Sequence, residues 1–138
     1  MEFLYRKYTL ESGEIVYRPE VSVLVEADKT RQTVGPCLLD TGSDKCIFSL
    51  EFAEIFNHKI DLKSKMKTSA AGGDTFYIYP SPKPVQITIS QDGFRAKSWK
   101  THIFYAEKQE PVILGFFGFI NQFDKIVFKP KEKKFTLN

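Results

Sequence analysis

A carboxylate follows directly on an apolar run in the segment LLDTGSD, residues 38–44. Ionised carboxylates avoid protein interiors unless they are paired or well hydrogen-bonded. Residues 34–39 are typical of a buried strand, and this strand would end at Asp40. Gly42 permits a sharp turn because it has no Cβ, and the hydroxyls of Thr41 and Ser43 can donate hydrogen bonds. The pattern predicts a carboxyl group held rigidly at the tip of a loop, in a position to do chemistry.

Short β-branched and aromatic runs, separated by turn residues, recur along the rest of the chain. Residues 21–25 form one such run, and residues 85–90 alternate well before a strong Gln-Asp-Gly turn at 91–93. We predict an opening hairpin from residues 3–10 and 15–17, and a closing hairpin from residues 125–128 and 135–137. These signals indicate an all-β protein.

Two stretches depart from the strand pattern. Apolar residues at 52, 55 and 56 predict one short helix, with Ser49 as its N-cap, and residues 118–123 predict a second short helical segment. At 138 residues the chain is expected to form a single domain, residues 1–138, with a core that needs no disulfide or metal. The predicted fold class is therefore all-β with one or two short helices.

The charge and hydropathy of the chain exclude several classes of partner. The net charge is only +3 and the basic residues are dispersed, which argues against nucleic-acid binding. No apolar run is long enough for a membrane span, and the start has no signal-peptide pattern, so a cytoplasmic protein that does not bind membranes is expected. Cys37 and Cys46 are expected to be free buried thiols rather than a disulfide scaffold.

A second glycine-rich feature lies about thirty residues after Asp40. Gly72, Gly73 and Asp74 stand between two extended flanks within residues 68–79, which is typical of a mobile hairpin tip. Prolines at 80, 82 and 84 follow directly and do not permit a central strand there. A third feature, the apolar run 111–114 that ends in Gly115, echoes the run that ends in the Asp40 loop.

In this order and spacing, the three features resemble the retropepsin-like aspartic proteases. Asp40-Thr41-Gly42 matches the catalytic motif of that family, and Gly72-Gly73 stands where the family has its flap. Ile113-Leu114-Gly115, followed by Gly118-Phe119, looks like the family's hydrophobic-hydrophobic-Gly motif and the short helix after it. The resemblance runs from about residue 21 to residue 137. It implies a closed or partly open β-barrel of the acid-protease type.

The resemblance also implies an activity, that of an aspartic endopeptidase acting on peptide or protein substrates without metal or cofactor. Such catalysis needs two carboxyl groups, one to activate water and one to protonate the leaving group. This chain has a single Asp-Thr-Gly, so the second Asp40 must come from a second copy in a homodimer.

The resemblance assigns roles to further residues. Thr41 would lock the two loops together, Gly42 would present its carbonyl to substrate, and Ser43 would support the Asp40 carboxylate. The remaining substrate contacts that the resemblance implies are Asp44, the flap glycines Gly72 and Gly73, and the flap residues Tyr77 and Ile78.

The chain departs from the retroviral members at two places. They carry an arginine just after the second glycine motif, where this chain has Phe116, so Asp44 lacks its usual partner. The C-terminal residues 131–138 need not form the interleaved dimer sheet of the viral enzymes. The way in which a dimer is built is therefore open.

Other interpretations of the same residues remain. Asp40 can be a turn carboxylate that caps a helix or accepts backbone amides, and the chain can be a catalytically silent retropepsin-like module that binds peptides or a partner. A catalytic Cys37 or Cys46 would need a histidine base nearby. His58 and His102 lack partners at metal-ligand spacing and are expected on the surface or in strands. Trp99 and the Phe-rich residues 116–123 are expected in the core, or in part at a dimer contact.

Overall fold

The computed structural model describes residues 1–138, and it is mostly β with one short α-helix. No helix in it is long and apolar enough to cross a membrane. The strands are β1 Glu2–Leu4, β2 Arg6–Thr9, β3 Ile15–Arg18, β4 Glu20–Ala27, β5 Thr30–Leu39, β6 Ile47–Ser49, β7 Met66–Ser69, β8 Thr75–Pro80, β9 Val85–Ile89, β10 Lys97–Thr101, β11 Phe104–Ala106, β12 Val112–Leu114, β13 Ile126–Lys129 and β14 Lys134–Leu137. The helices are α1 Glu51–Ile55 and three 3₁₀ turns, η1 Leu62–Ser64, η2 Ile120–Gln122 and η3 Pro130–Glu132.

Nine strands form one sheet, in the order β10-β9-β4-β5-β12-β6-β11-β8-β7. The two outer strands, β10 and β7, do not pair with each other, so the sheet stays open. The closed form of the predicted barrel is therefore not found. The all-β class is confirmed in its coarse form, with a single short α-helix.

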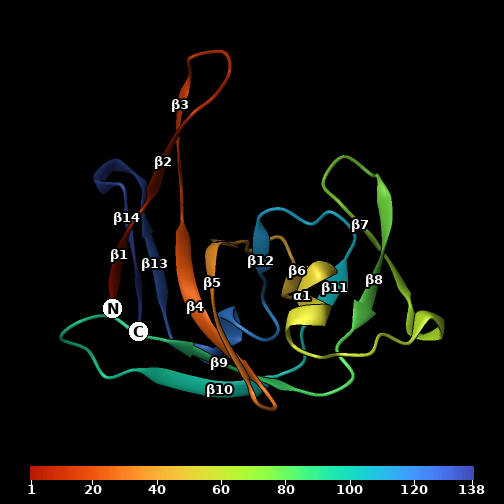
Figure 1. Cartoon of the computed structure of the whole chain (residues 1–138). Coiled ribbons are helices and arrows are strands. Elements are labelled where there is room, and N and C mark those ends of the chain that lie inside the picture. Colours follow the sequence, from red (N-terminus) through yellow and green to blue (C-terminus); the bar gives the residue numbers. More distant parts are fainter.

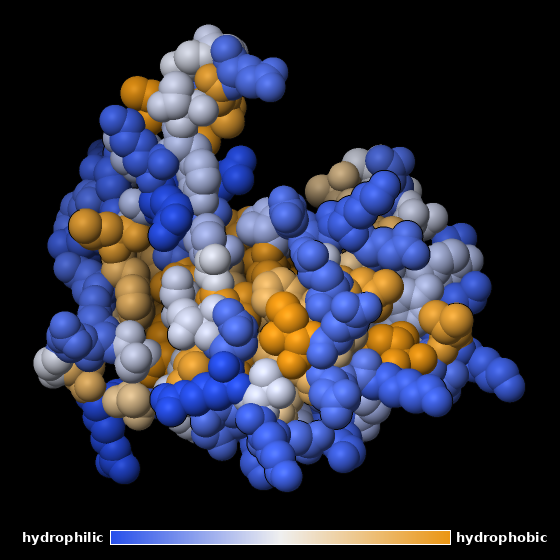
Figure 2. Space-filling model, in the orientation of Figure 1, coloured by the Kyte–Doolittle hydropathy of each residue, from blue (hydrophilic) through white to orange (hydrophobic).

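Two hairpins project on the same side of the molecule. One is formed by β2 and β3 and the other by β7 and β8, and the end of β5 lies between them (Figure 1). The space-filling view shows a hollow between the two projections (Figure 2). Both hairpins follow from the sequence, because turn residues separate two extended runs in each case.

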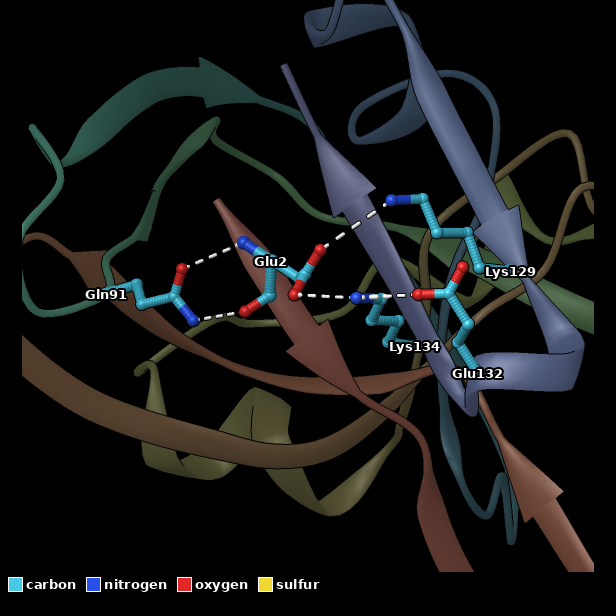
Figure 3. Close-up of polar contacts among 5 residues, drawn as sticks. All are labelled: Glu2, Gln91, Lys129, Glu132 and Lys134. Carbon is cyan, nitrogen blue, oxygen red and sulfur yellow. Dashed lines mark hydrogen bonds and ion pairs between the residues drawn. The ribbon is translucent and has the colours of Figure 1, made fainter.

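The two ends of the chain meet in a separate sheet of order β1-β14-β13. The closing hairpin is confirmed, and β1 adds to it, with Phe3 opposite Phe135. Figure 3 shows how β1 is tied down: the Glu2 carboxylate lies 3.3 Å from Lys134 Nζ and 3.8 Å from Lys129 Nζ, and the side chain of Gln91 bonds to both backbone polar groups of Glu2. Exposed ion pairs of this kind contribute little stability, so the main effect is to fix the register of β1.

The core consists of one large cluster of 22 buried residues and a small satellite of Ile47, Ile78 and Ala106. The large cluster takes alternate residues of β4 and β9, such as Val23, Val25 and Ile87, because successive side chains of a strand point to opposite faces. Each fully buried aliphatic or aromatic side chain of this kind stabilises the fold by about 1.5–3 kcal/mol.

Neither predicted helical segment forms as expected: α1 begins after a different cap, and the second segment is shorter. Ser49 is not the N-cap of α1: it is buried in β6, where it pairs with Ala106 of β11, and Leu50 caps the helix without a side-chain hydrogen bond. The segment 118–123 forms only the 3₁₀ turn η2, because Gly118 adopts a φ of +102° that a helix cannot contain.

The two histidines lie in different environments. His102 is exposed, as expected, whereas His58 is buried, with its Nδ1 2.6 Å from the hydroxyl of Tyr105. The prediction of a surface or strand position is therefore wrong for His58, whose segment folds back under α1 through a bond from its backbone N–H to Ala53 O. Burial lowers the pKa of His58 from its ordinary value of 6.5.

We expect His58 to make the protein less stable in mild acid. The native state binds a proton at His58 less readily than the unfolded chain does. The unfolding free energy is therefore at its full value above pH 6.5, and it falls as the pH drops from 6.5 through the lowered native pKa. Replacing His58→Gln should flatten the unfolding free energy between pH 7 and pH 5, by at most about 1.4 kcal/mol per pH unit. Urea unfolding across this range measures the slope, and parallel profiles for the two proteins would contradict the assignment.

Candidate active site

Asp40 is positioned by a pair of parallel strands. β5 lies beside β12 in parallel register, with Cys37 opposite Val112 and Leu39 opposite Leu114. The backbone N–H of Asp40 then donates to Leu114 O at 3.1 Å. The two apolar runs that echo each other in the sequence therefore lie side by side, and each ends in its glycine-containing turn at the same edge.

The loop after Asp40 closes by hydrogen bonds to its first residue. The backbone N–H of Gly42 donates to Asp40 Oδ1 at 2.8 Å, and the backbone N–H of Ser43 donates to Asp40 O at 3.2 Å. The hydroxyl of Ser43 donates instead to Lys45 O at 2.9 Å, so in this structure Ser43 supports Asp40 through its backbone and not through its side chain. One carboxylate oxygen of half-buried Asp40 is thus fixed by the backbone.

The loop after β12 holds the Asp40 loop from the other side. The backbone N–H groups of Phe116 and Phe117 donate to Ser43 O at 2.8 Å and Asp44 O at 2.9 Å. Gly115 makes this contact sterically possible, since a Cβ there would lie 2.3 Å from Lys45 O and 2.7 Å from Ser43 O. The third motif of the sequence thus serves to clamp the first.

A cavity of about 440 Å³ opens above this loop. Asp40, Ser43 and Asp44 line its floor, while the β7–β8 hairpin contributes residues 68–71 and Phe76. Lys45, Ile47, Gln109 and Ile113 complete the wall, together with Gly42. The carboxyl group of Asp40 therefore lines a cavity to which the β7–β8 hairpin also contributes.

The structure gathers some of the predicted site residues in this cavity and places others elsewhere. Asp40, Gly42, Ser43 and Asp44 line it, but exposed Thr41 does not. The remaining predicted residues belong to the β7–β8 hairpin and lie outside the cavity: Gly72, Gly73, Tyr77 and Ile78.

The two glycines form the exposed hairpin turn, with φ values of +101° and +90° that favour glycine. Tyr77 points to the other face of β8, where Lys65 Nζ lies 4.5 Å from the centre of its ring. Ile78 is only 1% exposed and packs in the satellite core, so its side chain does not reach the cavity surface. Phe76, and not Tyr77 or Ile78, is the residue of β8 that lines the cavity.

The sequence contained a signal for some of the missed residues. Residues 68–71 directly precede the glycine turn and Phe76 follows it closely on β8, so their place beside the predicted hairpin tip was a signal. Gln109 had no such signal. It reaches the cavity because its loop folds over the cleft, where its side chain donates to Pro111 O at 2.8 Å.

The two cysteines near this site are free and buried. Burial raises the pKa of Cys37 to about 12 and that of Cys46 to about 11. Because the thiolate is the nucleophilic form, neither thiol is activated at neutral pH. This environment does not support the alternative of a catalytic cysteine.

The likeness of this chain to known proteins lies in its structure. The sequence matches no known protein family, and it matches no curated protein. Among solved structures, the chain is similar to EIAV protease in complex with an inhibitor, with 27% sequence identity and a TM-score of 0.43. The match covers 78% of this chain and 86% of the other.

We predict that Gly115→Ala displaces the Asp40 loop. The new Cβ would clash with two backbone carbonyls, so we expect a loss of about 1–3 kcal/mol in unfolding free energy, together with shifted amide signals for residues 40–45. Heteronuclear NMR and urea unfolding measure the two effects. Gly13→Ala is the matched control, because a Cβ at Gly13 meets nothing within 4 Å and only its φ of +84° is strained. Unchanged loop signals in Gly115→Ala would show that the clamp does not exist.

Proposed function

We propose that this chain is an aspartic endopeptidase of the retropepsin-like type, in which two copies bring their Asp40 carboxyls together. The observation that carries the proposal is the placement of Asp40: the carboxyl ends a strand at the floor of a cleft, and the backbone N–H of Gly42 fixes one of its oxygens. A carboxylate that served only as a turn cap would need neither the cleft nor the hairpin above it.

The proposed reaction uses the two carboxyls in different protonation states. Two facing carboxyl groups share one proton, because ionising both is costly, and the pair loses its protons in two separate steps. The ionised carboxyl takes a proton from water, and the water oxygen attacks the peptide carbonyl. The other carboxyl supplies its proton to the substrate, and the leaving amine is protonated as the C–N bond breaks. The residues of the chain provide both proton transfers, so the reaction requires no cofactor.

The cleft suits an extended polypeptide. Its floor offers the carboxylates of Asp40 and Asp44 and the backbone of Gly42, and its roof is the β7–β8 hairpin. Gly72 and Gly73 at the turn would let the hairpin open for substrate and close over it, which excludes water from the reacting bond. In this proposal Asp44 and Gly42 bind the substrate main chain, Phe76 covers it, and Thr41 contacts the second loop.

Two exposed aromatic residues beside the Asp40 loop support a dimer. Phe116 is 45% exposed and Phe117 is 61% exposed, and both are bonded through their backbones to the loop that carries Asp40. The sequence placed the whole Phe-rich segment in the core or in part at a dimer contact. Trp99, Phe119 and Phe123 do pack in the core, whereas Phe116 and Phe117 face solvent. An isologous contact that joins the two Asp40 loops would cover them.

The terminal strands argue against a dimer in which a strand of the second copy pairs with β14. Both edges of β14 are already taken by β1 and β13 of the same chain. The free edge of β1 is occupied at Glu2, whose backbone groups bond to the side chain of Gln91 (Figure 3). A strand of a second copy therefore finds no open place beside β14, and we propose that the dimer forms through the Asp40 and Phe116 loops.

A catalytically silent peptide-binding module is the second candidate. One observation favours it: a single chain contains one Asp-Thr-Gly motif and already forms a cleft, so a monomer could bind an extended peptide without cleaving it. The two candidates differ in whether a dimer forms and whether Asp40 is needed for turnover.

We predict that Asp40→Asn abolishes peptide cleavage and leaves the fold intact. The amide oxygen can still accept from Gly42, but the group can no longer exchange a proton, so we expect turnover to fall at least about a hundredfold. Mass spectrometry of a diverse peptide mixture between acid and neutral pH measures cleavage. Asp92→Asn, the same change in the turn between β9 and β10, is the control and should cleave normally. Retained turnover in Asp40→Asn would disprove the carboxyl pair.

We also predict that activity depends on protein concentration. Below the dimer dissociation constant, each tenfold dilution should lower the specific activity nearly tenfold, since only dimers contain two Asp40 residues. The double variant Phe116→Ser/Phe117→Ser should raise that constant at least about tenfold, as measured by analytical ultracentrifugation. Phe94→Ser removes an equally exposed aromatic from the β9–β10 turn and should not change it. A folded wild-type chain that stays monomeric and cleaves nothing would favour the peptide-binding module.

A further inference from the structure

A second cavity, of about 520 Å³, lies beside the β2–β3 hairpin. Tyr8 and Arg18 of the hairpin form one wall, and β5 contributes Gly35 and Pro36. The rest of the lining comes from the end of β6, the start of α1, the loop before β12 and the first residue of β4, and its polar residues are Ser49, Glu51, Gln109, Glu110 and Glu20. Of these residues only Gln109 also lines the Asp40 cleft.

Glu20 is the unusual residue of this cavity. Its side chain is only 1% exposed, although it carries a carboxylate. Oε2 accepts a hydrogen bond from the hydroxyl of Tyr8 and lies 3.9 Å from Arg6 Nε, but Oε1 is buried and has no hydrogen-bond partner. A buried acceptor without a partner is costly, and the large majority of such groups in folded proteins are satisfied.

The other charges around the cavity do not satisfy this oxygen. Arg18 lines the wall, but its guanidinium carbon lies 5.0 Å from the centre of the Tyr8 ring, so the group is stacked on the aromatic face. Glu51 and Glu110 are exposed and add negative charge at the rim. The lining of the cavity thus includes the buried carboxylate of Glu20, one oxygen of which has no partner, and two exposed carboxylates at the rim.

We propose that this cavity binds a basic side chain of a polypeptide, with the guanidinium or ammonium group donating to Glu20 Oε1. A cavity of about 520 Å³ can accommodate an arginine or lysine side chain, whose apolar stem would pack against Pro36 and Phe52. The charged end supplies the donor that Oε1 lacks, and a charge-assisted bond to a carboxylate is among the stronger hydrogen bonds in proteins.

The cavity adjoins the Asp40 cleft, because Gln109 lines both. A polypeptide held in the cleft would therefore have a pocket for a basic side chain within its reach. Binding to Glu20 does not require cleavage, so the proposal stands or falls independently of the protease activity.

The test uses the isotope-labelled full chain and two small probes that differ in charge. N-acetyl-arginine amide is the cationic probe, and N-acetyl-citrulline amide is its neutral counterpart of nearly the same shape. We expect saturable shifts of the amide signals of Gly35, Glu51 and Val112 with the arginine probe, and at least about tenfold weaker binding of the citrulline probe. N-acetyl-lysine amide then tells whether an ammonium group is accepted as well.

Three variants test whether the arginine probe binds at Glu20. Glu20→Gln should weaken arginine binding at least about tenfold, because it removes the charge. Glu110→Gln, at the exposed rim, should weaken it about two- to threefold and provides the answer if Glu20→Gln does not fold. Glu54→Gln makes the same change on exposed α1 outside the cavity and should have no effect.

Several results would overturn the proposal. Equal binding of the arginine and citrulline probes would show that charge is not recognised, and full affinity in Glu20→Gln would show that Glu20 serves only as a structural partner of Arg6 and Tyr8. The absence of saturable shifts with all three probes at millimolar concentration would show that the cavity takes no basic side chain.

Discussion

The parallel pairing of β5 with β12 is the constraint on which the rest of the site depends. It brings Leu39 beside Leu114, so the turns that follow both strands meet at one edge of the sheet. Gly115 then lets the two turns touch, because its missing side chain leaves room for the carbonyls of Ser43 and Lys45. Asp40 is thereby held by backbone groups of two distant segments, which keeps a carboxyl group rigid in an open cleft.

The same sheet explains why the cleft has a roof. β6 and β11 continue the sheet beyond β12, and β11 pairs with β8, so the β7–β8 hairpin is anchored to the strands that carry the site. Ile78 secures that anchor by burying its side chain with Ile47 and Ala106. Residue 78 therefore stabilises the base of the hairpin, while Phe76, two residues earlier on the same face, lines the cavity.

The carboxylates of the two cavities differ in the partner that each lacks within one chain. In the cleft, Asp40 has a backbone partner and, in the proposed enzyme, needs a second carboxyl from another copy. In the second cavity, Glu20 already has Tyr8 and Arg6 nearby, but one oxygen remains without a donor. Both are carboxylates at the ends of β5 or β4 whose surroundings are incomplete within one chain, and each calls for a different kind of partner.

The sequence by itself determined the strands, the hairpin turns and the loop that presents Asp40, because these depend on local alternation, on turn residues and on glycine at particular places. It also drew attention to Gly115, which contacts the Asp40 loop, and to the glycine hairpin, other residues of which line the cleft. Only the tertiary structure decided that the sheet stays open, that Ser49 joins β6 instead of capping α1, and that Phe116 and Phe117 face solvent. The positions of Gln109 and Glu20 likewise could not be predicted from the sequence. A cavity is formed by segments far apart in the chain, and no local pattern indicates which side chains will meet there.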